Sequence, residues 1–152
     1  MVAEIGKPAP DFSLRDQNLQ KVSLSDLAGR KSLIVFIPYP FTSVCQGELC
    51  AIRDDLGVFD GMDANVIAIT CDTIAVNARW AVEQEYQFSI LSDFWPHGEV
   101  AMAYGCFDDR RGYAKRYTYV LDADGVVRNI IFSDELGEAR PHEAYAKALA
   151  AV

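Results

Sequence analysis

The sequence predicts an α/β fold in which a mixed central sheet is flanked by helices on both faces and extended by an N-terminal β-hairpin. Three observations carry this prediction. Two short apolar runs, residues 32–37 and 65–70, are rich in β-branched side chains, which is typical of strands buried on both faces. Apolar residues at helical spacing follow each run. Two further strands joined by an Asp-Gly turn then precede a final helix, so the strands are not all parallel.

The N-terminal part predicts a hairpin and one helical turn. Around a polar turn at residues 16–20, apolar and polar residues alternate, which indicates two paired strands. Ser25 is expected to cap a short helix that Gly29 ends. The buried strand at 32–37 follows and stops at Pro38.

Two amphipathic helices are expected after the two buried strands. The first should begin between Thr42 and Cys45 and continue beyond residue 55, because apolar positions recur at helical spacing: Leu49, Ile52, Leu56 and Phe59. The second should cover residues 73–86, with these positions on its apolar side: Ile74, Ala78, Ala81 and Val82.

The later elements are a short strand near residues 88–91, a helix at 97–104 that Gly105 ends, two strands at 117–122 and 126–132, and a helix at 142–152. The sequence DADG between the two strands faintly resembles a calcium loop, but its later ligand positions are apolar and it lacks the closing Glu. A turn is therefore favoured. This order of elements fits a thioredoxin-like fold, and no linker divides the chain, so we expect a single domain over residues 1–152.

Composition narrows the classes of function. The net charge of −8 disfavours nucleic acid as a partner. No apolar run approaches the roughly 20 residues of a membrane helix, and the N-terminal residues MVAEIGKPAP lack the apolar core of a signal peptide, so we expect a cytoplasmic protein without membrane contact. The four cysteines show no Cys-x-x-Cys spacing, and the two histidines lie far from them. We therefore expect no metal and no cofactor.

The segment IPYPFTSVC carries the chemistry. It leaves a buried strand and enters a helix, so Cys45 falls in the first helical turn, where unpaired N–H groups and the positive end of the helix dipole favour a thiolate. Pro38 and Pro40 stiffen the loop. The Thr42 hydroxyl can turn toward the thiol or cap the helix. Position alone leaves open whether Cys45 is a nucleophile or an inert buried thiol.

The same segment resembles the P-x-x-x-T-x-x-C signature of peroxiredoxins of the AhpC/TSA superfamily. Across nearly its whole length the chain looks most like the alkyl hydroperoxide reductase E type, on four segments: GKPAPDFSLRDQN, FTSVCQGEL, LSDFWPHG and KRYTYVLD. The resemblance implies a thiol peroxidase whose Cys45 is oxidised by hydrogen peroxide or organic hydroperoxides, with peroxynitrite as a further substrate.

The resemblance also implies roles for matching positions. Pro38 would shield the thiolate from water, and Thr42 would hydrogen-bond the thiolate and the peroxide. Arg116 would be the active-site arginine that stabilises the thiolate and polarises the peroxide. Glu48 resembles a carboxylate that orients this arginine. Without the resemblance, a solvated strand-edge charge is the favoured interpretation of Arg116, and Glu48 could equally be a solvated helix residue.

Cys50 departs from the one-cysteine pattern of this type. Cys50 lies five residues after Cys45, which resembles the placing of the second cysteine in peroxiredoxin Q, also called bacterioferritin comigratory protein. There the second cysteine resolves the sulfenic acid. In an intact helix, residues five apart lie about 7.5 Å apart along the axis, so a disulfide requires the first turns to unwind. Cys50 is expected to project away from the buried stripe. The alternative is an incidental cysteine and an external thiol reductant.

Other assignments stay open at this stage. We expect Cys71 and Cys106 to be packing residues, Trp80 and Trp95 to be core or interface aromatics, and His97 to be structural. A thioredoxin-like disulfide oxidoreductase is disfavoured because Glu48 stands where its second cysteine would be. A peroxide-sensing relay protein using Cys45 remains the alternative function. Expected partners are a peroxide, a thiol reductant (thioredoxin, a mycoredoxin- or glutaredoxin-like protein, or a low-molecular-weight thiol) and a second copy in a homodimer.

Overall fold

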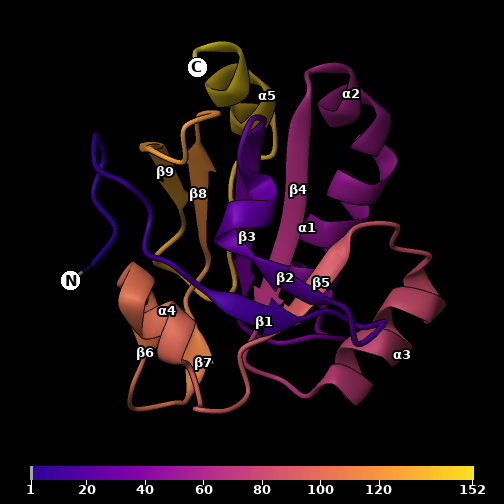
Figure 1. Cartoon of the computed structure of the whole chain (residues 1–152). Helices are drawn as coiled ribbons and strands as arrows, with labels where there is room; N and C mark the ends of the chain where they lie inside the picture. The colour runs from indigo at the N-terminus through magenta and orange to yellow at the C-terminus, as the bar shows by residue number, and fades with distance from the viewer. Residues whose placement is uncertain (1) are drawn as a thin grey trace.

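The computed structural model describes residues 2–152 and is built on one mixed sheet of seven strands in the order β2-β1-β5-β4-β3-β8-β9 (Figure 1). β3 and β5 run parallel to β4, whereas β8 is antiparallel to β3. This confirms the predicted thioredoxin-like α/β fold with its N-terminal hairpin of β1 and β2. The strands are β1 Ser13–Arg15, β2 Lys21–Ser23, β3 Lys31–Ile37, β4 Ala64–Thr70, β5 Ser89–Ser92, β8 Tyr117–Leu121 and β9 Val127–Phe132.

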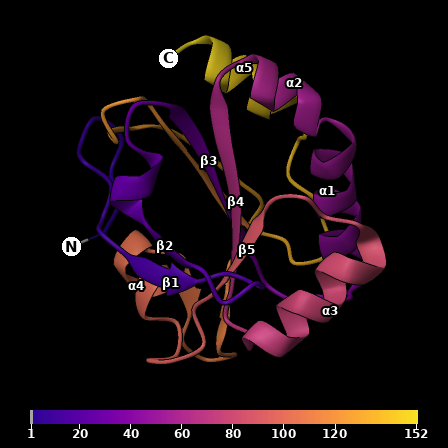
Figure 2. The same cartoon turned by 45° about the vertical axis from the view of Figure 1, so that its right-hand side comes forward.

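Helices cover both faces of this sheet (Figures 1 and 2). One face packs against α1 (Ser43–Asp54), α2 (Leu56–Gly61), α3 (Ile74–Gln84) and α5 (Glu143–Ala150). The other carries α4 (Glu99–Tyr104) and a separate hairpin of β6 (Phe107–Asp108) and β7 (Tyr113–Ala114). Side chains of β3 alternate between these two cores, which is why its sequence is a continuous apolar run.

The first helical turn is capped differently from the prediction. It is a 3-10 helix, η1 (Leu24–Leu27), and its N-cap is Ser23, not Ser25. The Asp26 carboxylate accepts a hydrogen bond from the Ser23 N–H at 2.8 Å. An acidic residue three positions after Ser23 therefore satisfies a free N–H group at the start of the turn.

The predicted first long helix is interrupted. The break lies at Asp55, whose φ and ψ of −102° and 10° end α1 before α2 begins. The Asp55 carboxylate lies 2.6 Å from His142 Nε2, at the start of α5. This tertiary contact could not be seen in the helical periodicity, which continues through the break to the buried Phe59.

The apolar side predicted for α3 was right at Ala81, which is buried, and wrong at Val82. Val82 is 75% exposed, and the buried positions are Asn77, Trp80 and Ala81. Asn77 can be buried because its amide accepts a hydrogen bond from the Thr70 hydroxyl at 2.8 Å and donates to the Leu91 carbonyl. The periodicity counted only apolar residues and therefore missed this buried amide.

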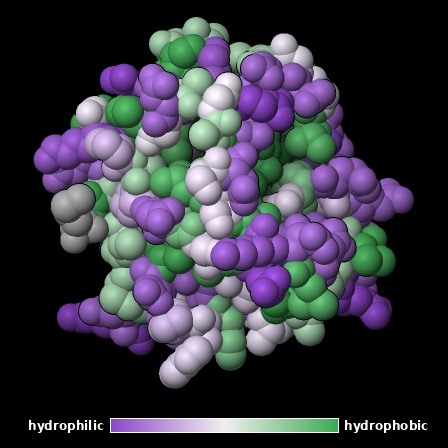
Figure 3. Space-filling view, in the orientation of Figure 1, coloured by the Kyte–Doolittle hydropathy of each residue, from purple (hydrophilic) through white to green (hydrophobic). Residues whose placement is uncertain are grey.

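The remaining elements agree with the prediction. Gly105 ends α4 with a φ of +82°, and an Asp122 to Gly125 turn joins β8 to β9. Hydrophilic and apolar residues are interspersed on the face shown in Figure 3. Within residues 2–152, no helix is both long and apolar enough to cross a membrane, and no group of three or more His, Cys, Asp or Glu residues is placed to hold a metal ion.

Candidate active site

Cys45 lies at the start of α1, where the chain turns from β3 into the helix. It is the third residue of α1, and its exposure is 0%. The first backbone bond of the helix joins the Gln46 N–H to the Thr42 carbonyl at 2.8 Å. The N–H groups of residues 43–45 precede that bond and have no partner in the helix. Cys45 therefore lies in the first turn of the helix, at the positive end of the helix dipole.

The loop before α1 is stiff and tightly turned. Pro38 is buried directly after β3, and Phe41 adopts a φ of +68°, a left-handed conformation that is uncommon for a non-glycine residue. Thr42 is the N-cap residue, but its hydroxyl makes no capping hydrogen bond. Instead it donates to the Tyr39 carbonyl at 2.7 Å.

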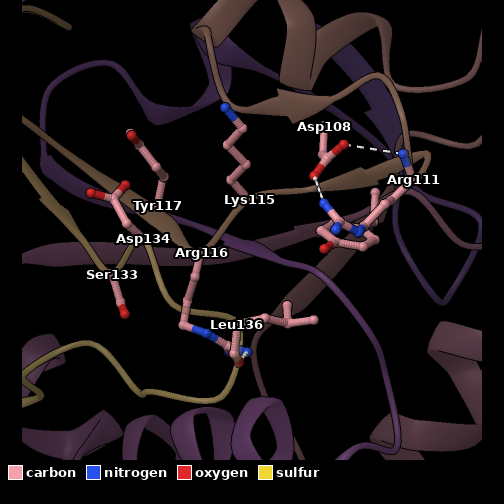
Figure 4. Close-up of a pocket in the computed structure, with 9 residues that line it drawn as sticks. Asp108, Arg111, Lys115, Arg116, Tyr117, Ser133, Asp134 and Leu136 are labelled. Atoms are coloured by element: carbon pink, nitrogen blue, oxygen red, sulfur yellow. Dashed lines mark hydrogen bonds and ion pairs between the residues drawn. The ribbon is translucent and has the colours of Figure 1, made fainter.

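Arg116 reaches the thiol from a part of the chain that is distant in sequence. It lies between β7 and β8, and its side chain points away from that of Lys115, down toward Leu136 (Figure 4). Nη1 donates to Cys45 Sγ at 3.3 Å and also to Glu48, and Nη2 donates to the Leu136 carbonyl. Nε is buried without a partner. Arg116 is 3% exposed, so it is not the solvated strand-edge charge that the sequence left open.

Glu48 joins Arg116 to a second buried arginine, Arg140. The Glu48 carboxylate accepts hydrogen bonds of 2.8 Å from Arg140 Nε and Nη2 and one of 2.9 Å from its backbone N–H. The remaining amine, Arg140 Nη1, donates to the Phe36 carbonyl and the Thr118 hydroxyl at 2.8 and 3.2 Å. Each partner of Arg140 is therefore fixed by the fold, and Glu48 is held in one orientation.

The charges of this network favour an anion at Cys45. Burial alone would raise the pKa of Glu48, but hydrogen bonds and attraction from Arg140, with Arg116 adding to them, hold that pKa below its usual 4.5. Glu48 is therefore ionised, and it balances one of the two guanidinium charges. One positive charge is left in a buried region beside the sulfur.

Sequence reasoning missed Arg140. It lies in the loop before α5, where nothing distinguishes it from a surface arginine. The sequence of α1 nevertheless indicated that a buried cation was needed, because residues 45, 48, 49 and 52 share one helical face. That spacing places Glu48 among buried residues, and a buried carboxylate requires cationic partners.

Cys50 lies on a different face of α1 from Cys45 and is only half-buried. It does not project freely into solvent, because its Sγ lies 3.5 Å from the Tyr86 hydroxyl and 3.6 Å from Gln84 Oε1, at the end of α3. All four cysteines are free thiols in this structure. Cys71 and Cys106 are buried, and burial raises the pKa of both, to about 12 for Cys71, which suits inert packing residues.

A surface cavity of about 350 Å³ opens beside Arg116 (Figure 4). Its wall contains Lys115, the Asp108–Arg111 ion pair and Tyr113, whose ring packs against that of Tyr39 in the active-site loop at 4.7 Å. Of the two tryptophans, Trp80 is fully buried, whereas Trp95 is 82% exposed.

Comparisons with known proteins agree on one family. The model of the AhpC/TSA family matches residues 5–130. Alkyl hydroperoxide reductase E of Mycobacterium tuberculosis is 43% identical over 151 residues, covering 97% of both chains. Peroxiredoxin Q of Oryza sativa is 37% identical over 82% of this chain and 57% of that protein. The solved structure of peroxidoxin BcpB from Mycobacterium tuberculosis superposes with a TM-score of 0.85 at 29% identity, over 97% of this chain and 95% of that one.

Proposed function

Because the chain belongs to the AhpC/TSA family of peroxiredoxins and is thus a thiol peroxidase, we propose that Cys45 is the residue that attacks the peroxide. One observation carries the proposal. Cys45 is the cysteine whose sulfur accepts a hydrogen bond from a buried guanidinium, that of Arg116 at 3.3 Å. Thiolates are the nucleophilic form of cysteine, and this contact stabilises one.

In the first half-reaction, the Cys45 thiolate attacks one oxygen of the peroxide. An S–O bond forms as the O–O bond breaks, and the leaving oxygen takes a proton to become water or an alcohol. Arg116 Nε, a buried donor without a partner, is available to that oxygen as negative charge develops on it. The Thr42 hydroxyl donates to Tyr39, so its free lone pairs can accept a hydrogen bond from the peroxide O–H. Pro38 keeps water from the sulfur.

Glu48 and Arg140 act on this reaction through Arg116. Glu48 holds one amine of Arg116 beside Cys45, and Arg140 fixes Glu48 in turn. Both are positioning residues. The substrates are hydrogen peroxide and organic hydroperoxides, with peroxynitrite as a further oxidant of the same thiolate.

In the second half-reaction, a thiol attacks the Cys45 sulfenic acid, forms a disulfide and releases water. We propose Cys50 as this thiol. The pair is five residues apart in α1, so the first turns of the helix unwind before the bond forms. Without Cys50, an external thiol would attack directly. Thioredoxin, a mycoredoxin- or glutaredoxin-like protein or a small thiol then returns the enzyme to its reduced state.

We further propose that the protein forms a homodimer and that it resides in the reducing cytoplasm. The aromatic side chains of Tyr39 and Phe41 on the active-site loop are 41% and 44% exposed, which suits burial against a second copy. The four free thiols fit a reducing compartment.

Turnover of a hydroperoxide with several thiol reductants tests the proposed function. Wild type should consume many equivalents, C45S should lose this activity, and C50S should form no intramolecular disulfide and depend on the external thiol. Stoichiometric oxidation of Cys45 without further turnover would instead identify a peroxide-sensing relay protein. Full activity in C45S would overturn the assignment of Cys45.

A further inference from the structure

Tyr86, just beyond the end of α3, places its hydroxyl group against two residues of α1. The hydroxyl donates to the Gln46 carbonyl at 3.4 Å, and it lies 3.5 Å from Cys50 Sγ. Gln46 and Cys50 are four residues apart in α1, so the helical hydrogen bond from the Cys50 N–H to the Gln46 carbonyl closes the turn between them. The Tyr86 hydroxyl therefore contacts both ends of one helical turn.

The side chain of Tyr86 is held in one position. It is 4% exposed, and its backbone N–H donates to the Ala81 carbonyl at 3.0 Å. Its ring packs edge to face against that of Trp80, at a centroid distance of 5.3 Å, and stacks on that of Phe88 at 5.2 Å. Burial raises the pKa of Tyr86 above its usual 10, so the hydroxyl keeps its proton and remains a donor.

A second contact from α3 holds the same turn. The Trp80 indole N–H donates to the side-chain oxygen of Gln46 at 3.1 Å. The backbone oxygen of Gln46 has two lone pairs, so it can accept from the Cys50 N–H and from the Tyr86 hydroxyl together. The turn that contains Cys50 is therefore held folded by side chains that lie outside α1.

These contacts oppose the movement that the second half-reaction requires. Cys45 and Cys50 lie on different faces of α1, and a disulfide between them forms only when the turns between them unwind. Unwinding breaks the bond between the Cys50 N–H and the Gln46 carbonyl and takes Cys50 away from the Tyr86 hydroxyl. Because the Tyr86 contacts exist only in the folded helix, they increase the free energy that unwinding costs.

We propose that Tyr86 is a positioning residue, which keeps the turn from Gln46 to Cys50 folded while Cys45 reacts with peroxide and thereby sets the rate at which Cys50 reaches the sulfenic acid. The inference rests on the proposed role of Cys50 as the resolving thiol. In that step the Cys50 sulfur bonds to the Cys45 sulfur, the S–O bond breaks, and the hydroxyl group leaves as water with the proton of the Cys50 thiol. Tyr86 acts on this step through the helix.

Substituting Y86F tests the proposal, because it removes the hydroxyl and retains the packed ring. With one equivalent of hydrogen peroxide, Cys45 should be oxidised at the wild-type rate, since its contact with Arg116 is unaltered. The Cys45–Cys50 disulfide should form about fivefold faster, the change expected when the net contribution of one hydrogen bond is lost from the folded helix. Rapid quenching and mass spectrometry follow both steps.

Y104F is the matched control. Tyr104 in α4, on the other face of the sheet, is also buried, and its hydroxyl donates to a backbone carbonyl, that of Pro10 at 2.7 Å. A general loss of stability would affect both variants alike, whereas the proposal predicts the wild-type rate of disulfide formation in Y104F. Equal rates in wild type and Y86F would overturn the role of Tyr86. Absence of the disulfide from both proteins would instead overturn the role of Cys50, and with it the effect of Tyr86 on this step.

Hydrogen exchange of the Cys50 amide in the reduced protein separates these two failures, because it requires no disulfide. This N–H bonds to the Gln46 carbonyl, so it exchanges when the turn opens. Exchange should be about fivefold faster in Y86F than in wild type and unchanged in Y104F. Equal exchange in Y86F and wild type would show that Tyr86 does not hold the turn.

Discussion

At the scale of single residues, the arrangement around Cys45 depends on the Glu48 carboxylate, which binds two arginines. Glu48 lies between two buried guanidinium groups, and the exposures of all three side chains are 4% or less. Removing one member of such a group leaves charge buried without compensation, which typically costs about 3–5 kcal/mol. The geometry of Arg116 and the stability of the fold therefore depend on the same residue.

Substituting E48Q should lower the free energy of unfolding by about 3–5 kcal/mol at pH 7, because two guanidinium charges lose their counterion. The control is E83Q, which removes an exposed ion pair with Arg79 and should cost under about 1 kcal/mol. Urea titration measures both. Equal losses in the two variants would show that the buried network contributes no more than a surface pair.

The low pKa of Glu48 also predicts a pH dependence. A carboxyl group whose pKa is lowered on folding adds stability above its unfolded value of 4.5, and this stability is lost as the pH falls through the folded pKa. Wild type should therefore lose stability steeply below pH 4.5, and E48Q less steeply. Parallel acid unfolding curves would contradict the assignment of an ionised Glu48.

Arg140 should behave as a positioning residue. R140K retains the charge but lacks the planar fork that holds both Glu48 oxygens. We expect kcat/KM for peroxide to fall by about tenfold or more, and pre-steady-state kinetics should place the loss in oxidation of Cys45. An unchanged rate of this step in a folded R140K protein would show that Glu48 needs no second arginine.

At the scale of elements, α1 presents two different faces to the rest of the protein. Cys45 and Leu49 belong to the core under the sheet, whereas Cys50 contacts Gln84 at the end of α3 and Tyr86 just beyond it. The two thiols cannot meet without unwinding of the turns between them. Helix stability between residues 45 and 50 should therefore limit the rate of disulfide formation.

Gly47 offers a test of this unwinding. It is exposed in α1, and a Cβ atom added there meets nothing within 4 Å. G47A should stabilise the helix by about 0.5–1 kcal/mol and slow formation of the Cys45–Cys50 disulfide by about two- to fivefold. The rate of Cys45 oxidation in G47A should equal that of wild type. Rapid quenching and mass spectrometry measure both steps.

G57A is the matched control, since Gly57 lies in α2 and has the same free space. It should leave the rate of disulfide formation unchanged. If G47A and G57A form the disulfide equally fast, then unwinding of α1 does not limit the step.

The elements show why sequence prediction succeeded in some places and failed in others. The alternating contacts of β3 and the Gly105 stop of α4 depend on local chemistry, so the sequence predicted them. The break at Asp55 accompanies a contact with His142, 87 residues away, and local periodicity contains no trace of it. The buried face of α3 was predicted only in part, at Ala81, because an amide, Asn77, occupies another of its positions.

At the scale of the whole molecule, the site is assembled from segments that only folding brings together. Cys45 and Arg116 are 71 residues apart in the chain, and Glu48 and Arg140 are 92 apart. The signature segment and the resemblance to peroxiredoxins predicted Cys45, Arg116 and Glu48. They did not predict Arg140 or the direction of the Thr42 hydroxyl, because both depend on tertiary contacts.

The proposed dimer predicts a change in mass on substitution in the active-site loop. Wild type should sediment as a dimer, and F41E should sediment as a monomer because a charge replaces an apolar contact. V58E, which alters an exposed valine in α2, should remain dimeric. A monomeric wild type, or equal behaviour of the two variants, would exclude an interface at this loop.

Of the four cysteines, Cys45 is the one that we expect to react first with peroxide. The most direct test is peptide mapping of the reduced protein quenched within milliseconds of adding one equivalent of hydrogen peroxide, with the thiols of C45S followed in parallel. We predict that Cys45 is oxidised within that time, either to the sulfenic acid or to its disulfide with Cys50. In C45S, the rate of thiol oxidation by hydrogen peroxide should be lower by at least about a thousandfold. First oxidation at Cys50, Cys71 or Cys106, or an undiminished rate in C45S, would show that Cys45 is not the residue that attacks the peroxide.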